Sequence, residues 1–131
     1  MKNSKHLLFI TLGVIFWLNG VVLVRQLGEA MLTLNNPYRF WAFILAIPVT
    51  IFSLIITKYI SKLEYSNLLR PVVIMTFTAT LLDGLAFAFY RSLYSNSVEV
   101  ALNGAALILW GAGLGLLFAY YLEHKVEKNA I

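Results

Sequence analysis

Residues 71–89 read PVVIMTFTATLLDGLAFAF, and the only charged side chain in this apolar stretch is the carboxylate of Asp83. An α-helix needs about 20 mostly apolar residues to cross the hydrocarbon layer of a membrane. A transmembrane β-barrel would instead show short segments of alternating apolar and polar residues, and this sequence shows none. We therefore predict one domain over residues 1–131, an all-α integral membrane four-helix bundle. Its spans are expected at about Leu7–Val24, Phe40–Thr57, Pro71–Phe89 and Val100–Tyr121.

The composition supports a membrane protein. Of the 131 residues, 60% are hydrophobic and 12% are charged, whereas a soluble domain carries about 25% charged residues. The chain has no cysteine, which excludes disulfides, thiol catalysis and metal sites ligated by cysteine. His6 and His124 are expected at the same edge of the membrane, but no carboxylate accompanies them at ligand spacing. We predict neither a metal site nor a cofactor.

The basic residues predict how the chain is oriented. If the spans alternate in direction, both termini and the loop between the second and third spans lie on one side. That side holds seven of the ten basic residues and every lysine, which is the bias of cytoplasmic segments. We predict a multi-pass protein of the cell's inner (plasma) membrane with both termini in the cytoplasm. Because the basic residues are divided among loops, we expect them to meet anionic membrane lipids and not nucleic acid. The outer interface is expected at Tyr38, Trp41, Tyr90 and Tyr94.

One pattern, a leucine, a polar residue and a glycine, occurs in three of the predicted spans. It reads Leu18-Asn19-Gly20, Leu82-Asp83-Gly84 and Leu102-Asn103-Gly104. At about 1.5 Å per helical residue, the three polar side chains would lie roughly 5–10 Å below the outer boundary. Gln26 projects from the same helix face as Asn19, two turns further out, and Arg25 lies just above. A carboxylate at this depth is costly to keep, so this polar layer is the best candidate for a functional site.

We predict that the layer binds a ligand around Asp83. The amide side chains would supply oriented hydrogen bonds, and Arg25 would set the ionisation of Asp83 or meet an anionic group. Thr80 shares a helix face with Asp83. Trp17 and Trp110 place indole N–H groups near the middle of their helices, where each needs a partner or a cavity. The candidate ligand-binding residues are Asp83, Asn19, Asn103, Arg25, Gln26, Thr80 and Trp110.

Each of these residues also has a purely structural interpretation. Asparagine in membrane helices often joins two helices through a hydrogen bond. Threonine often hydrogen-bonds to the backbone of its own helix, as Thr80 would. Asp83 would then pair with Arg25 or Arg91 and fix the helix packing.

Two stretches leave the regular pattern of the spans. Residues 26–34 either extend the first helix or lie on the outer surface, and the sequence favours neither. Asn35-Asn36-Pro37 breaks the chain before the second span. Pro48 removes a backbone donor near the centre of that span, and hydroxyl groups follow it at helical spacing that can satisfy freed backbone groups. These hydroxyls belong to Thr50, Ser53 and Thr57.

The last span is rich in small residues. Gly111 and Gly115 form a G-x-x-x-G pair, and Gly104 lies two turns earlier on a similar face. Small residues let a second membrane helix approach closely. The partner helix belongs either to the same chain or to a second subunit, and a homodimer through these three glycines is one expectation.

Several short motifs resemble those of one protein family. They are Val24-Arg25-Gln26-Leu27-Gly28, Ile47-Pro48, Leu81-Leu82-Asp83 and Leu109-Trp110-Gly111. Together they resemble a family of small bacterial four-span membrane proteins that is known only as a domain of unknown function. The resemblance implies a bacterial inner-membrane setting and singles out Arg25, Asp83 and Trp110. It implies no activity.

The leading hypothesis is a small integral membrane protein that binds, and in a stronger form transports, a small solute or cation at Asp83. The second is a non-transporting accessory or regulatory subunit that docks a larger partner through the last span. The third is a lipid-modifying enzyme with Asp83 as base, but no second reactive group converges with it by spacing. No P-loop, G-x-S-x-G or H-E-x-x-H motif occurs, so an enzyme is the least favoured of the three.

Overall fold

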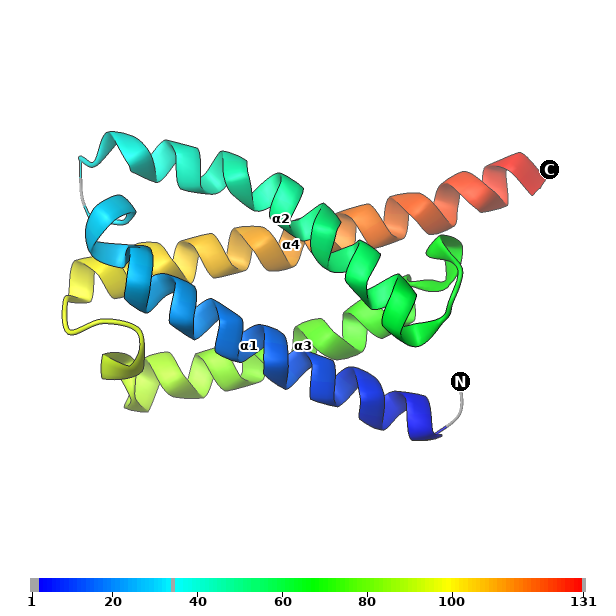
Figure 1. Cartoon of the computed structure of the whole chain (residues 1–131), viewed down its shortest axis with the longest axis horizontal. Helices are drawn as coiled ribbons and strands as arrows, with labels where there is room; N and C mark the ends of the chain where they lie inside the picture. Colours follow the sequence, from blue (N-terminus) through cyan, green and yellow to red (C-terminus); the bar gives the residue numbers. More distant parts are fainter. Residues whose placement is uncertain (1–2, 34, 131) are drawn as a thin grey trace.

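Four long helices joined by short connections make up most of the chain in the computed structural model, which describes residues 3–33 and 35–130. Side chains are described for residues 5–33 and 35–125. The elements are α1 (Asn3–Met31), α2 (Pro37–Ser61), η1 (Tyr65–Asn67), α3 (Leu69–Phe89), η2 (Arg91–Leu93) and α4 (Val98–Ala130), where η marks a single 3₁₀ turn. Consecutive helices alternate in direction, so α1 begins and α4 ends at the same end of the bundle (Figure 1). We call this the terminal end, and the opposite end, which holds the α1–α2 and α3–α4 connections, the loop end.

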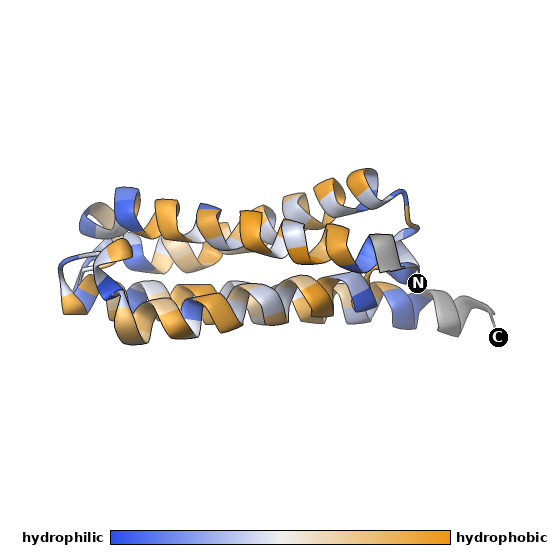
Figure 2. Ribbon diagram, turned by 90° about the horizontal axis from the view of Figure 1, so that it is seen from below, coloured by the Kyte–Doolittle hydropathy of each residue, from blue (hydrophilic) through white to orange (hydrophobic). Residues whose placement is uncertain are grey.

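The outer surface of the bundle is apolar. Each of the four helices is long and apolar enough to cross a membrane, and hydrophobic residues occur along all of them (Figure 2). Phe40, Leu81 and Phe89 are 67%, 66% and 74% exposed. Soluble monomers rarely expose apolar patches of more than a few hundred Å². This surface is suited to lipid, and the prediction of an all-α bundle with four candidate spans is confirmed.

The helices extend beyond the predicted spans. α1 continues through Arg25 to Met31, so the segment after residue 25 is a helical extension as far as Met31; residue 34 lies outside the described residues. α3 begins at Leu69, which places Pro71 in the first turn, where its missing N–H is not needed. Hydropathy marks the part of a helix that sits in hydrocarbon, whereas helical hydrogen bonding continues into the polar flanks.

The connection between α1 and α2 depends on two asparagines and a proline. Asn35 has a φ of 61°, a left-handed conformation that asparagine adopts more readily than most residues. Asn36 caps α2, because its Oδ1 accepts the backbone N–H of Tyr38 at 2.8 Å. Its Nδ2 also donates to the carbonyl of Ala30 at 2.7 Å. The predicted break is confirmed, and Asn36 ties the end of α1 to the start of α2.

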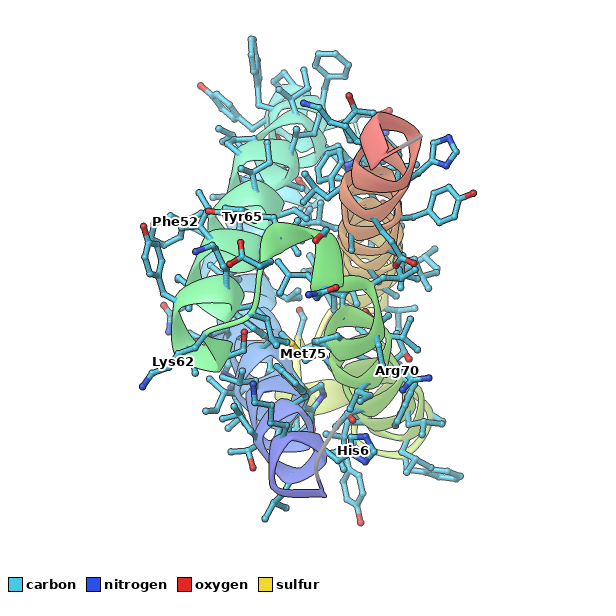
Figure 3. The ribbon with its side chains drawn as sticks, turned by 90° about the vertical axis from the view of Figure 1, so that its right-hand side faces the viewer. His6, Phe52, Lys62, Tyr65, Arg70 and Met75 are labelled. Atoms are coloured by element: carbon cyan, nitrogen blue, oxygen red, sulfur yellow. The ribbon has the colours of Figure 1, made fainter. Side chains whose placement is uncertain are left out.

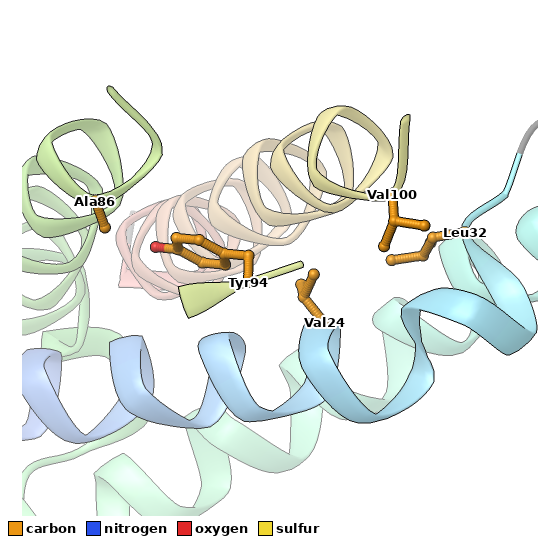
Figure 4. Close-up of a cluster of buried hydrophobic side chains, with 5 residues drawn as sticks. All are labelled: Val24, Leu32, Ala86, Tyr94 and Val100. Atoms are coloured by element: carbon orange, nitrogen blue, oxygen red, sulfur yellow. The ribbon is translucent and has the colours of Figure 1, made fainter. Parts of the chain in front are cut away.

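The interior consists of three apolar clusters. The cluster at the loop end contains Val24, Leu32, Ala86, Tyr94 and Val100 (Figure 4). The second cluster joins α1 to α3 through Phe9, Leu12, Ile74 and Met75. The third contains Leu54, Leu68, Val72 and Ala119. In the view from the terminal end, Met75 points inward between the helices, whereas Lys62 points away from them (Figure 3).

Three glycines allow helices to approach each other closely. A Cβ at Gly13 would lie 2.9 Å from the carbonyl oxygen of Met75 and 2.9 Å from Cβ of Thr78, both in α3. Gly28 and Gly104 make the same kind of approach between α1 and α4. Lipid gives helices no hydrophobic reason to associate, so such close packing is a main source of stability in a membrane bundle.

The small-residue face of α4 is used largely within the chain. Gly104 and Gly115, two of the three glycines expected at a dimer interface, are buried. A Cβ at Gly115 would meet side chains of Thr50 and Val72 at 3.9 Å, whereas Gly111 has open space around it. The homodimer remains a prediction, and of the three glycines only Gly111 is open to a second subunit.

The hydroxyl groups of α2 bond to their own helix. Thr50, Ser53 and Thr57 donate to the carbonyl oxygens four residues earlier, at 2.7, 2.9 and 2.8 Å. α2 continues through Pro48 without ending. This geometry matches the structural interpretation of these hydroxyls, because each one meets a backbone acceptor of α2 itself.

We expect Gly13→Ala to lower the free energy of unfolding by about 1–3 kcal/mol, the usual range for overpacking a filled interior. The Met75 carbonyl is backbone and cannot rotate away from the added methyl group. The matched control is Gly20→Ala in the same helix, where a Cβ would meet nothing within 4 Å. Its helix propensity should leave the protein unchanged or up to about 1 kcal/mol more stable. Unfolding in mixed micelles, followed by circular dichroism, measures both variants, and equal effects would contradict the close α1–α3 contact.

Candidate functional site

Asp83 takes part in a chain of hydrogen bonds that crosses the loop end of the bundle. The hydroxyl of Tyr94 donates to Oδ1 of Asp83 at 2.5 Å. The same hydroxyl accepts the indole N–H of Trp17, from Nε1 to Oη, at 3.1 Å. The three residues come from α3, the α3–α4 connection and α1, and Asp83 is only 8% exposed. These hydrogen bonds link three separate parts of the fold through the hydroxyl of Tyr94.

Tyr94 is positioned by the 3₁₀ turn η2. Its backbone N–H donates to the carbonyl of Arg91 at 3.0 Å, which turns the chain back toward the bundle. Its ring stacks on Phe87 with centroids 3.7 Å apart and an interplanar angle of 11°. The side chain is 0% exposed, and its hydroxyl is directed toward α3 (Figure 4). Stacking and burial hold the hydroxyl in place for Asp83.

Burial raises the pKa of Tyr94 above its ordinary value, and the hydrogen bond to Asp83 raises this pKa further. The indole N–H of Trp17 acts in the opposite direction, but more weakly than burial. The hydroxyl therefore keeps its proton throughout the physiological pH range. Tyr94 serves as a constant donor to Asp83 and a constant acceptor for Trp17.

Arg25 was one of the two partners, with Arg91, that the structural interpretation gave Asp83, and its guanidinium bonds elsewhere. Its guanidinium donates instead to the carbonyl oxygens of Ser92 and Leu93, at 2.6 and 3.3 Å. Arg25 thus fastens the connection that carries Tyr94, and its effect on Asp83 is indirect. Among the described residues, the only hydrogen bond to the Asp83 side chain comes from the neutral hydroxyl of Tyr94.

One oxygen of Asp83 remains available. Among the described residues, no side-chain nitrogen or oxygen is both fully buried and without a hydrogen bond. Oδ1 holds the bond from Tyr94, and Oδ2, which has no hydrogen bond among the described residues, is therefore not fully enclosed. A carboxylate oxygen accepts hydrogen bonds and binds cations, so this atom can take a proton, a donor or a small cation.

The other residues of the predicted polar layer do not bond to Asp83. Asn103 donates from Nδ2 to the carbonyl of Leu32 at 2.6 Å, which satisfies an acceptor at the end of α1. Asn19 and Gln26 are exposed. Thr80 donates to the carbonyl of Thr76 in its own helix at 2.7 Å. The layer is therefore divided into separate contacts, most of which hold helices or connections together.

Both mid-helix tryptophans have the partners that the sequence required. The indole N–H of Trp110 donates to the carbonyl of Phe43 in α2 at 2.9 Å. Phe43 lies one residue before Ile44, whose carbonyl cannot receive a bond from Pro48. Trp110 thus joins α4 to the part of α2 that the proline perturbs, away from Asp83. Among the described residues, no three His, Cys, Asp or Glu side chains gather into a metal site.

Sequence reasoning missed the role of Tyr94. The residue was expected at the outer interface, and nothing in its immediate neighbours indicates that the connection folds inward. One signal did exist, since Trp17 needed a partner for its N–H, and a tyrosine after the third span could provide one. Tyr94 lies eleven residues after Asp83 and beyond the end of α3 at Phe89, so pattern analysis along one helix could not find the pair.

The fold and the site define an α-helical, multi-pass membrane protein in which hydrogen bonds join Asp83, Tyr94 and Trp17 near the loop end. Comparisons with protein-family models, with curated proteins and with solved structures found no match. The resemblance to small four-span bacterial proteins thus remains a prediction. The function has to be argued from the residues themselves.

We expect Tyr94→Phe to lower the free energy of unfolding by about 1–3 kcal/mol, the usual cost of leaving a buried polar group without its partner. The substitution keeps the stacked ring but removes both hydrogen bonds of the hydroxyl. Tyr90→Phe is the matched control, because Tyr90 lies at the same end and is 68% exposed. Thermal unfolding in detergent compares the two variants. A Tyr94→Phe protein as stable as the Tyr90→Phe protein would show that the hydrogen bonds of the Tyr94 hydroxyl contribute nothing to the stability of the fold.

Proposed function

We propose that the protein binds a small cation or a proton at Asp83, near the loop end of the bundle. The observation that carries this proposal is the combination of a nearly buried carboxylate, a single neutral donor and one oxygen left over. Ionisable groups in membrane helices are costly and commonly mark ion or proton pathways. A group kept only for packing would be better served by an uncharged residue or a fully paired one.

The bonding of the nearby basic side chain supports cation binding at Asp83 over a permanent ion pair. Arg25 is the basic residue that the sequence predicts just above Asp83. Its guanidinium donates instead to backbone carbonyls of the α3–α4 connection. The negative charge of Asp83 is therefore left to be balanced by a positive ion that binds reversibly. A proton or a small monovalent cation fits this role, because Asp83 is only 8% exposed.

The orientation of the protein is part of this proposal. The lysines whose side chains the structure describes all belong to the helix ends at the terminal end. They are Lys5, Lys58, Lys62 and Lys125. Under the positive-inside rule, that end faces the cytoplasm and Asp83 lies in the outer half of the membrane. The site would then exchange its cation with the outer face of the membrane, which the resemblance implies is a bacterial inner membrane.

Asp83→Asn is expected to abolish cation binding while preserving the fold, because the amide oxygen can still accept the hydroxyl of Tyr94. The measurement is difference infrared spectroscopy of the protein in liposomes, following carboxyl bands during steps in pH, Na⁺ and K⁺. The wild-type protein should show a carboxyl band that responds to at least one of these cations and disappears in Asp83→Asn. Glu29→Gln is the control, since Glu29 is an exposed carboxylate on α1, and it should keep the band.

Two results would overturn the proposal. One is a wild-type protein whose carboxyl bands attributable to Asp83 do not change under any of the three steps. The other is an Asp83→Asn protein that retains the full response. A loss of thermal stability in Asp83→Asn, without any cation response in the wild type, would assign Asp83 to packing alone.

A further inference from the structure

A groove runs along the outside of the bundle between α2 and α4, separate from the Asp83 site. Its volume is about 520 Å³, within the range of about 300–1,000 Å³ that is typical of ligand pockets. One end is polar and the remainder is apolar. The lining residues are Asn36, Pro37, Arg39, Phe40, Phe43, Ile44, Ile47 and Trp110.

The length of the groove matches one leaflet of a membrane. Its lining on α2 extends from the start of that helix to Ile47, which at about 1.5 Å per residue is roughly 15 Å along the helix axis. The hydrocarbon core of a bilayer is about 30 Å thick, so this is about half of it. The polar end lies at the beginning of a candidate span and the apolar end near its middle.

Arg39 gives the polar end a positive charge. Its guanidinium makes one long hydrogen bond to another described side chain, from Nη1 to Oδ1 of Asn103 at 3.5 Å. Arg39 is also partly exposed, in the first turn of α2. Guanidinium groups bind phosphate through paired N–H donors. An anionic group that reached the groove from the headgroup region would meet Arg39 first.

The apolar part of the groove has a defined wall. Trp110 reaches from α4 and donates its N–H to the carbonyl of Phe43, so its ring is held against α2. The rings of Phe43 and Trp110 lie 6.2 Å apart, between centroids. These rings and the side chains of Ile44 and Ile47 offer an apolar surface without an exposed polar side chain, which is what a hydrocarbon chain requires.

We propose that this groove binds one anionic phospholipid, with the phosphate at Arg39 and an acyl chain lying along Phe43, Ile47 and Trp110. Charge at one end, apolar lining at the other and a length of one leaflet together select a lipid over a water-soluble ligand. A transmembrane helix of a second copy would need contacts along the whole span, whereas this groove ends about halfway. Asp83 does not line the groove, so this site can be tested independently of the proposed cation site.

Native mass spectrometry of the detergent-solubilised chain tests the proposal. The protein is mixed with equal amounts of phosphatidylglycerol and phosphatidylcholine that carry identical acyl chains. The wild type should retain phosphatidylglycerol in preference to phosphatidylcholine. Arg39→Gln should lower the affinity for phosphatidylglycerol about fivefold, the effect of one basic residue near an anionic headgroup. Arg91→Gln, which removes an exposed arginine at the same end, should leave the affinity unchanged.

A second variant tests the apolar part of the groove. Ile44→Trp should fill it and reduce the retention of both lipids, and Asp83→Asn should change neither. The lipid proposal would be overturned by equal retention of the two lipids in the wild type, or by equal losses in Arg39→Gln and Arg91→Gln. Because the chain has no cysteine, Phe40→Cys provides a single crosslinking site. Efficient disulfide dimers of that variant in liposomes would assign the groove to a second copy instead.

Discussion

The hydrogen bond from Tyr94 to Asp83 is the interaction on which the loop end of the bundle depends. Helices in lipid gain nothing from the hydrophobic effect when they associate, so buried polar contacts and close packing have to hold them. Tyr94 brings the α3–α4 connection into the interior, and its hydroxyl joins α3 to α1 through Asp83 and Trp17. Arg25 secures the same connection from α1. The loop-end cluster packs around the ring that these bonds position.

This arrangement also determines what Asp83 can do. Tyr94 contributes a donor that keeps its proton, and Arg25 is committed to backbone carbonyls. The carboxylate is therefore partly satisfied and has no cationic partner among the described residues. A fully paired aspartate would be inert, and an unsatisfied one would be too costly to bury. The intermediate case, with one oxygen bonded and one available, is the condition that reversible cation binding needs.

The fold was largely predictable, because long apolar runs report membrane spans directly. The chain break at Asn35-Asn36-Pro37 was predictable from turn chemistry, and the partners of Trp17 and Trp110 were required by their N–H groups. The candidate site was less predictable. Asp83 stood out as a lone charge, but its partner lies across a short connection whose inward path depends on stacking with Phe87. The similar depth predicted for Asn19, Asn103 and Asp83 did not mean that they meet, since depth says nothing of the direction in which a helix face points.

A double-mutant cycle between Asp83 and Tyr94 tests the central claim most directly. The free energies of unfolding are measured for the wild type, Asp83→Ala, Tyr94→Phe and the double variant under identical detergent conditions. A direct, buried hydrogen bond predicts that the two substitutions are not additive, with a coupling free energy of about 1 kcal/mol or more. Additive effects, within about 0.5 kcal/mol, would show that the two side chains act independently. That result would remove the basis for the loop-end site.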